Sequence, residues 1–283
     1  MAVQHFSLNI AHHGENQILT IENPLATMSL SLRGAQIISF IPKKDQRERL
    51  WMSPINDFGT KRSIRGGIPV CWPWFANQRP NNDESLPMHG FLRTGMWQLL
   101  EISSLAGGGS LIKLKYDVQP QAGFEYHANV TLTITLNEQL KVELNTKNAG
   151  SEAFPVTMAL HSYFAVRQLN NIELQGVSGS YRDKNRELNT FNTPSPYFIH
   201  RATDSIHDGD VANIRIVEES DITGIQNDGH DSAVIWNPGK EGAKSVANIP
   251  DEDYQHFICI ESALTKMKMI DAGENHTLTQ IIS

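Results

Sequence analysis

The sequence has few of the features that mark secreted or disulfide-linked proteins. It contains only two cysteines among 283 residues, Cys71 and Cys259, which are far apart and form no Cys-x-x-Cys arrangement. Two isolated cysteines in a chain of this size indicate reduced, buried thiols and favour a cytoplasmic location. The first residues, 1–6, show no basic segment followed by an apolar run, so no secretion signal is predicted.

Long apolar runs and an excess of positive charge are also missing. No stretch approaches the ~18 apolar residues that would predict a membrane-spanning helix. The 24 basic and 31 acidic side chains give a net charge of −7, which argues against a general nucleic-acid binder. We therefore expect neither a membrane nor a nucleic acid as partner.

Several motifs of common enzyme classes are absent. The sequence has no His-Glu-x-x-His and no Cys/His spacing typical of a zinc site. It has no glycine loop of the dinucleotide-binding or Walker type, and no Gly-x-Ser-x-Gly. These absences predict no metal and no nucleotide cofactor, and they remove the usual signal of a serine hydrolase.

What the sequence does contain is alternation of apolar and polar residues. Apolar side chains alternate with threonines over 130–136 and with polar residues over 140–144, and 137–139 turns the chain between them. This period of two is typical of half-buried strands and predicts a hairpin. Further short strands are predicted at 18–21, 28–32, 37–41, 97–102, 111–118, 172–177, 214–217, 233–236, 257–260 and 278–282.

The pattern as a whole predicts an all-β protein. Turn residues separate the strands, as in antiparallel sheets, so we expect one domain over 1–283 built from two packed sheets. One short helix is predicted at 242–249, closed by Pro250. Two long segments without periodicity, 51–95 and 178–210, are predicted to build a site, because long loops in compact domains usually do.

The first candidate for chemistry is the segment 65–75, RGGIPVCWPWF. Its paired glycines permit a positive φ and close approach of another group. Lys61, Arg62 and Arg65 place three cations next to these glycines, and a guanidinium can hold phosphate oxygens in a bidentate fork. The alternative is a rigid turn with solvated basic side chains.

The second candidate is the segment 89–93, HGFLR. His89 is suited to hydrogen-bond a sugar hydroxyl and Arg93 to hold an anion. The alternative is a structural histidine and a surface ion pair.

The third candidate is His161, in the segment 160–166, LHSYFAV. If this segment is a strand, His161 shares a face with Tyr163 and Ala165. An imidazole in so apolar a neighbourhood is either a hydrogen-bonded core residue or a proton carrier.

The fourth candidate is Glu261, which follows the apolar run 257–260. A carboxylate in this position is rarely fully buried unless it has a partner or a catalytic function. It is either a base that points into a cleft or a member of a structural salt bridge.

Weaker signals come from the second long segment and a late strand. The polar runs 181–184 and 202–204, the latter ending in Asp204, are of the kind that bind sugars, although without further support ordinary loop chemistry is the favoured explanation. Trp236, in the run 236–238, is a core residue or a platform for a sugar ring.

Taken together, these segments resemble the aldose 1-epimerase (mutarotase) superfamily. The resemblance is closer to its hexose-6-phosphate mutarotase branch, also called glucose-6-phosphate 1-epimerase. It covers most of the chain and rests on motifs that occur in the order known from the family: 65–69, 89–93, 161–164, Asp204, 236–238 and 260–261. The aromatic segment 72–74 departs from the family pattern, so the rim of the pocket is expected to differ.

The resemblance implies a galactose-mutarotase-like β-supersandwich that needs no cofactor. It implies that His161 is the acid toward the ring oxygen and Glu261 the base toward the anomeric hydroxyl. His89 and Asp204 would bind sugar hydroxyls. The residues that would hold a 6-phosphate are Arg65 and Arg93, with Lys61 or Arg62 assisting.

Three other functions remain open at this point. The protein could be a mutarotase for neutral aldoses, or a glycoside hydrolase or lyase that uses Asp204 and Glu261 as paired carboxylates. It could also be a carbohydrate-binding or regulatory protein without catalysis. We expect a monomer.

Overall fold

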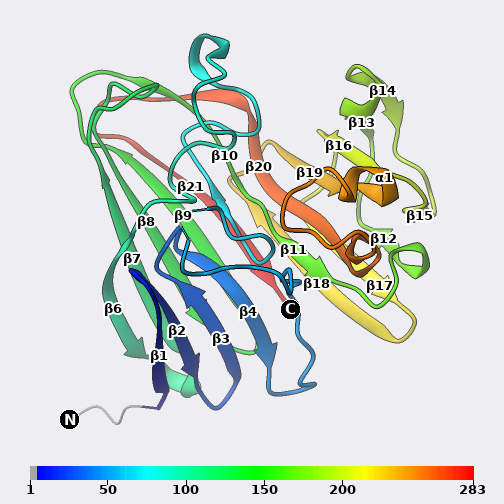
Figure 1. Ribbon diagram of the computed structural model, residues 1–283, viewed down its shortest axis with the longest axis horizontal. Coiled ribbons are helices and arrows are strands. Elements are labelled where there is room, and N and C mark those ends of the chain that lie inside the picture. Colours follow the sequence, from blue (N-terminus) through cyan, green and yellow to red (C-terminus); the bar gives the residue numbers. More distant parts are fainter. Residues whose placement is uncertain (1–4, 61) are drawn as a thin grey trace.

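A computed structural model describes residues 5–60 and 62–283 of the protein, and Lys61 lies outside this part. Its elements are almost all antiparallel strands, which confirms the predicted all-β class. The strands form three sheets (Figure 1). Among the described residues no helix is long and apolar enough to cross a membrane.

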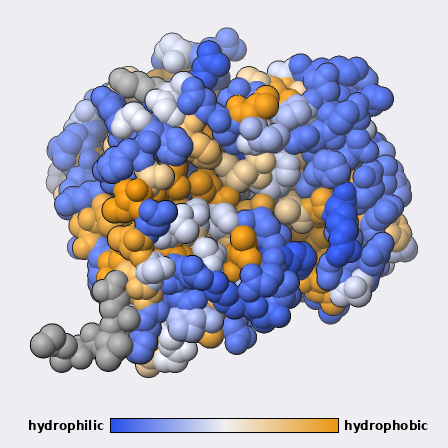
Figure 2. Space-filling model, turned by 60° about the horizontal axis from the view of Figure 1, so that its bottom comes forward, coloured by the Kyte–Doolittle hydropathy of each residue, from blue (hydrophilic) through white to orange (hydrophobic). Residues whose placement is uncertain are grey.

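The first sheet has four strands in the order of the sequence. Its first strand is an open edge with every residue exposed, including Leu8 and Ile10. On the surface shown in Figure 2, hydrophobic residues gather beside the N-terminal end of the chain. The strands are β1 (Ser7–His13), β2 (Asn16–Glu22), β3 (Ala26–Ser31) and β4 (Gln36–Pro42).

The second sheet has nine strands in the order β15-β12-β17-β18-β21-β9-β8-β7-β6. The predicted hairpin lies at its centre, with Leu132 opposite Leu144 and both side chains buried. The strands are β6 (Gln98–Ser104), β7 (Ser110–Val118), β8 (Ala128–Leu136), β9 (Leu140–Asn148), β12 (Glu173–Gln175), β15 (Tyr197–Phe198), β17 (Asn213–Glu218), β18 (Asp221–Asp228) and β21 (Asn275–Ile282).

The third sheet has eight strands, and it carries the candidate site. Its main order is β14-β13-β16-β19-β20-β10-β5, and β11 pairs with β20 beside β10. The strands are β5 (Val70–Cys71), β10 (Phe154–Leu160), β11 (Tyr163–Ala165), β13 (Ser180–Asp183), β14 (Asn189–Asn192), β16 (Thr203–His207), β19 (Ser232–Asn237) and β20 (Phe257–Ile270).

One continuous hydrophobic core joins the sheets. It includes Leu30 of the first sheet, Leu132 of the second, and Ile235 and Ile260 of the third, all of them buried. Ile235 and Ile260 are paired across β19 and β20, so their side chains point to the same face of the third sheet. The opposite face of these strands is therefore left for other contacts.

Helical elements are few and short, and the helix predicted at 242–249 is wrong in its extent. The α-helix α1 spans only Gly239–Ala243. Turns follow it, and Asn248 has a left-handed φ of 64°, which cannot continue a right-handed helix. The 3₁₀ turns are η1 (Pro80–Asn82), η2 (Ala106–Gly108), η3 (Leu169–Asn171), η4 (Lys184–Arg186) and η5 (Asp253–His256).

The segment 178–210, expected to be a long loop, is also corrected by the structure. It contains four short strands, β13 to β16. These strands are two to five residues long, and all but β15 carry polar side chains on both faces. Strands of that kind leave no apolar alternation to detect.

A buried arginine ties the C-terminus to the loop that follows β4. Arg49 is only 1% exposed, and its Nε donates to the backbone oxygen of Ser283 at 3.2 Å. Its Nη2 contacts Asp45 Oδ2 at 2.6 Å. Nearby, Arg47 Nη2 donates to the backbone oxygen of Ile222 in β18. These bonds join the loop after β4 to the C-terminal residue Ser283 and to β18.

Candidate active site

The floor of the candidate site is one face of the third sheet, and strand register builds it. Ile206 of β16 is opposite Val234 of β19, which is opposite Glu261 of β20. Residues that are opposite one another across antiparallel strands point to the same face. A second row runs through the same strands two residues away, with Asp204 opposite Trp236.

A cavity of about 660 Å³ lies above these rows. The long segment 51–95 covers it on the other side, as the sequence predicts for a loop of that length. Five of the six predicted site residues line the cavity: Arg65, His89, His161, Asp204 and Glu261.

His161 lies at a break between two strands. The strand β10 ends at Leu160 and β11 begins at Tyr163, so the predicted continuous strand is interrupted. The backbone N–H of His161 donates to Pro69, which holds the residue against the first long segment. Its ring stacks on Tyr163 with centroids 4.9 Å apart and an interplanar angle of 8°. The imidazole is therefore fixed while one edge faces the cavity.

Glu261 is the carboxylate that this imidazole faces. His161 Nε2 lies 3.4 Å from Glu261 Oε1, and the carboxylate is 1% exposed. The other polar atoms of the pair, His161 Nδ1 and Glu261 Oε2, have no hydrogen-bond partner among the described residues. A buried pair with unused donors and acceptors is unusual for a purely structural contact.

Burial shifts both groups toward their neutral forms. Desolvation lowers the pKa of His161 well below its ordinary value of 6.5, and the charge of Arg93 lowers it further. Desolvation raises the pKa of Glu261 well above 4.5, opposed by the charge of Lys184. Burial thus shifts the pKa of both side chains away from their ordinary values. Shifts of this kind in a cavity are typical of residues that act as acid or base in catalysis.

The paired glycines bring Arg65 to this site, as predicted. Gly66 and Gly67 have φ values of 102° and 63°. A Cβ on Gly67 would lie 2.1 Å from the backbone oxygen of Ile37, so only glycine permits this approach. Arg65 Nη1 donates to the hydroxyl of Tyr163 at 3.0 Å. The guanidinium is thereby fixed at the wall of the cavity.

His89 lies close to His161, with ring centroids 5.3 Å apart. Its Nδ1 accepts a hydrogen bond from the backbone N–H of Ala76 at 3.2 Å. Burial and the charge of Arg93 lower its pKa well below 6.5, so the ring is neutral and its proton is on Nε2. This nitrogen is left to donate to a ligand oxygen.

Of the remaining predicted cations, Arg93 and Arg62 do not line the cavity. Arg93 is buried, and its Nε has no hydrogen-bond partner in the described part of the chain. Its charge acts on the site, because it lowers the pKa of both His89 and His161. Arg62 is exposed outside the cavity, and Lys61 lies outside the described residues.

Sequence reasoning did not single out two charged residues that line the cavity, Arg182 and Lys184. Both belong to a polar run that pointed to sugar binding. Lys184 Nζ contacts Asp204 Oδ1 at 3.1 Å. Trp236 also lines the cavity, where its ring meets His161 edge to face at 6.0 Å. No sequence signal singles out Lys184, because it lies in the 3₁₀ turn η4, beyond the end of β13, where strand alternation does not place its side chain.

The fold is that of solved mutarotase-like proteins. A Salmonella typhimurium structure described as a "putative mutarotase" has a TM-score of 0.88 and 25% identity, over 97% of this chain and 92% of that one. A galactose mutarotase-like protein from Clostridium acetobutylicum has a TM-score of 0.77 and 13% identity, over 99% and 98% of the two chains. The protein therefore has the predicted galactose-mutarotase-like fold.

Sequence comparison gives the family. The family model of aldose 1-epimerase matches residues 17–283. An Escherichia coli relative named "Putative glucose-6-phosphate 1-epimerase" is 30% identical over 88% of this chain and 83% of its own. A Salmonella typhimurium relative of the same name is 28% identical over 87% and 82%. The chain belongs to the aldose 1-epimerase family, a family of sugar isomerases.

Proposed function

We propose that the protein interconverts the α and β anomers of a hexose 6-phosphate, as a glucose-6-phosphate 1-epimerase. The observation that carries this proposal is the contact of 3.4 Å between His161 Nε2 and Glu261 Oε1 on the wall of a cavity of about 660 Å³. A buried acid/base pair beside a cavity of this size suits a small polar substrate.

The reaction needs two proton transfers, and the pair supplies both. His161 donates a proton to the ring oxygen O5 while Glu261 removes the proton of the C1 hydroxyl. The C1–O5 bond breaks and the C1 carbonyl forms. Rotation about C1–C2 presents the other face of the carbonyl, and the reverse transfers close the ring. Each transfer contributes about 10²–10⁴-fold to the rate.

The other lining residues would orient the sugar. His89 Nε2–H donates to a hydroxyl oxygen, and the Asp204 carboxylate accepts from a hydroxyl. Arg65 supports the choice of a phosphorylated substrate, because its guanidinium is fixed by Tyr163 at the cavity wall. A fixed guanidinium loses little freedom when it binds phosphate oxygens.

A mutarotase for neutral aldoses is the second candidate, and one observation favours it. Arg93, the second residue expected to hold the phosphate, does not line the cavity. Arg93 would then attract the phosphate only at a distance, through its charge and without a direct contact. With only Arg65 of the two expected phosphate ligands at the cavity, the site would discriminate less strongly between glucose 6-phosphate and glucose.

Anomer exchange measured by NMR separates the two candidates. The rates for glucose 6-phosphate and for glucose are measured with and without protein, because both sugars anomerise spontaneously. The proposal predicts a higher kcat/KM for glucose 6-phosphate. Equal values for both sugars would favour the neutral aldose, and no acceleration of either would refute catalysis of this reaction.

A further inference from the structure

Lys184 is fixed at the side of the cavity where Asp204 lies. Its side chain is 28% exposed and that of Asp204 26%. Its Nζ lies 3.1 Å from Asp204 Oδ1 and 5.4 Å from the centre of the Phe75 ring, within the range of a cation–π contact. The contact with Asp204 is ionic, since Oδ1 makes no hydrogen bond within the described residues. The carboxylate therefore keeps the ability to accept from a ligand.

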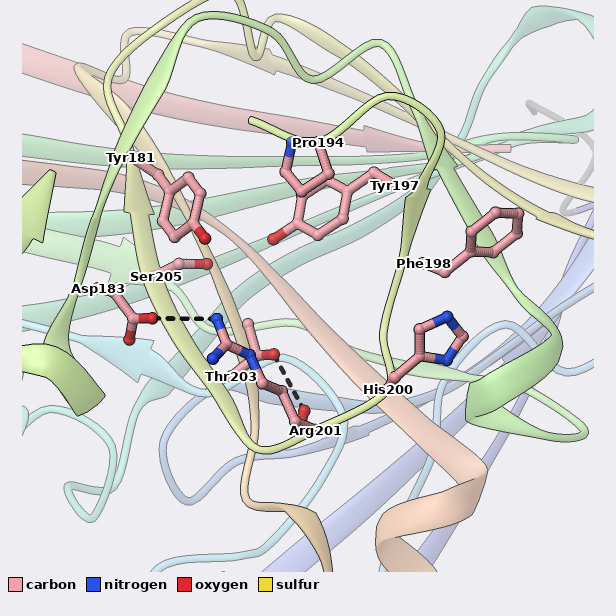
Figure 3. A pocket seen from close by; sticks show the side chains of 9 residues that line it. All are labelled: Tyr181, Asp183, Pro194, Tyr197, Phe198, His200, Arg201, Thr203 and Ser205. Carbon is pink, nitrogen blue, oxygen red and sulfur yellow. Dashed lines mark hydrogen bonds and ion pairs between the residues drawn. The ribbon is translucent and has the colours of Figure 1, made fainter. Parts of the chain in front are cut away.

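The backbone on either side of Lys184 is held from the opposite face of the sheet. Asp183 accepts from the backbone N–H of Asn185 and from Arg186 Nε. Figure 3 shows Asp183 and Arg201 joined within a small separate cavity. Asp183 lines this small cavity and Lys184 lines the larger one, so Asp183 anchors the segment on one side while Lys184 reaches the larger cavity on the other.

Lys184 acts on the charges of the acid/base pair. Its positive charge lowers the pKa of Glu261 against the effect of burial, and it lowers the pKa of His161. Asp204 acts on Glu261 in the opposite direction. The charged and titratable groups that act on the pair from the surrounding elements are Lys184, Asp204, Arg65 and Arg93, and His89 lies beside it.

We propose that Lys184 is a positioning residue of the acid/base site, whose ammonium group fixes the Asp204 carboxylate and supplies positive charge on the Asp204 side of Glu261. This inference rests on the proposed anomerase function and adds a residue to it. Lys184 acts through its neighbours: Asp204 is held in place to bind a hydroxyl, and the pKa of Glu261 is lower than burial alone would make it, which favours the carboxylate that accepts the C1 proton.

The test compares three variants by their anomer-exchange kinetics on glucose 6-phosphate across pH. Lys184→Met removes the charge and keeps the length of the side chain. Lys184→Arg keeps the charge. Lys266→Met is the matched control, because Lys266 also pairs with an aspartate, Asp208 at 3.5 Å, outside the cavity. Lys184→Gln replaces Lys184→Met if thermal melting shows that the latter does not fold, and it is read in the same way.

The expected result for Lys184→Met is a loss of about tenfold to a hundredfold in kcat/KM, typical of losing a charged contact. The pH profile should also move to higher pH, because Lys184 lowers the pKa of both Glu261 and His161 and its removal raises both. Lys184→Arg should recover most of the activity at the wild-type pH optimum, and Lys266→Met should match the wild type.

A Lys184→Met enzyme with unchanged kinetics and pH profile would overturn the inference. So would a loss of activity without a shift in the profile, since that indicates a merely structural role.

Calorimetry separates this inference from the proposed function. Glucose 6-phosphate is titrated into Glu261→Gln with and without Lys184→Met, and we expect the second substitution to weaken binding. Binding that depends on Lys184 without turnover in the wild type would overturn the anomerase function and keep the role of Lys184 in holding Asp204. Binding that does not depend on Lys184 would overturn that role, and the absence of both turnover and binding would overturn both.

Discussion

At the scale of single residues, the site is defined by two side chains that burial has moved toward neutrality. His161 and Glu261 are 7% and 1% exposed, and they face one another at the wall of the cavity. Neither has a second hydrogen-bond partner for its remaining polar atom among the described residues. Their free hydrogen-bonding capacity is thus directed to a substrate and not to the fold.

The first prediction concerns catalysis. His161→Ala or Glu261→Gln should each lower kcat by about 10²–10⁴-fold, because each removes one proton transfer. Anomer-exchange NMR gives the rate, and circular dichroism checks that the fold persists. Glu274→Gln, at an exposed glutamate, is the control for the chemical change and should match the wild type. Retention of most activity in either site variant would contradict the assignment.

The second prediction concerns stability against pH. The pKa of Glu261 in the folded state is raised above its ordinary 4.5 by burial. Between that ordinary value and the folded value, the unfolded chain releases a proton that the folded chain keeps, so stability falls as pH rises. The Glu261→Gln variant does not lose stability in this way, because its side chain does not titrate. The difference between its Tm and the Tm of the wild type should therefore increase from pH 4.5 upward, whereas Glu274→Gln should show no such trend. A difference in Tm that does not change with pH would contradict the raised pKa.

Much of the site was predictable from single residues, and the reasons for the exceptions are physical. The ordered motifs were enough to bring Arg65, His89, His161, Asp204 and Glu261 to one cavity. Arg93 was misplaced because a motif does not say which way a side chain points. Lys184 was missed because its role depends on a contact with Asp204 across two strands, and no local pattern records such a contact.

At the scale of elements, the glycine pair before β5 determines where the first long segment meets the sheet. The third prediction is that Gly67→Ala lowers the free energy of unfolding by about 2–4 kcal/mol, from overpacking and a left-handed φ. Urea denaturation measures it. Gly273→Ala is the matched control, since its φ is 80° and no atom lies within 4 Å of the added Cβ. Equal losses in both variants would show that φ alone matters and that the close approach to Ile37 does not.

Strands with one apolar face were predictable at this scale, and short polar ones were not. The hairpin β8–β9 follows the alternation directly. The strands β13 and β16 are held by pairing with one another and with β19, which are tertiary contacts. The helix predicted at 242–249 failed because its apolar residues alternate with glycine, serine and asparagine, and Asn248 turns left-handed. Local propensity is a weak guide where neighbouring elements decide the backbone.

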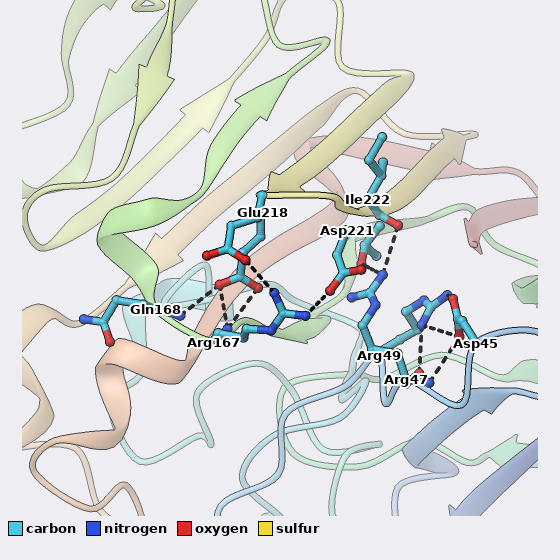
Figure 4. Close-up of polar contacts among 10 residues, drawn as sticks. Asp45, Arg47, Arg49, Arg167, Gln168, Glu218, Asp221 and Ile222 are labelled. Carbon is cyan, nitrogen blue, oxygen red and sulfur yellow. Dashed lines mark hydrogen bonds and ion pairs between the residues drawn. The ribbon is translucent and has the colours of Figure 1, made fainter.

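At the scale of the whole molecule, Arg49 connects the first sheet to the C-terminus. The fourth prediction is that Arg49→Met lowers the free energy of unfolding by about 1.5–3 kcal/mol, because the Ser283 and Arg47 carbonyls lose the donors of a buried guanidinium. Arg167→Met in the neighbouring network (Figure 4) is the control. Arg167 is 58% exposed, and an exposed ion pair contributes less than about 1 kcal/mol. Similar losses in both variants would contradict the role of burial. Urea denaturation measures both.

The floor of the cavity is built from alternate residues of neighbouring strands, and this constrains how the protein can change during evolution. Inserting one residue before Ile260 within β20 would turn the Glu261 carboxylate into the hydrophobic core and bring Ile260 to the cavity. The floor strands can therefore vary by substitution but not by length. Insertions and deletions should be confined to the segments that cover the cavity, and new substrate preferences should arise there first.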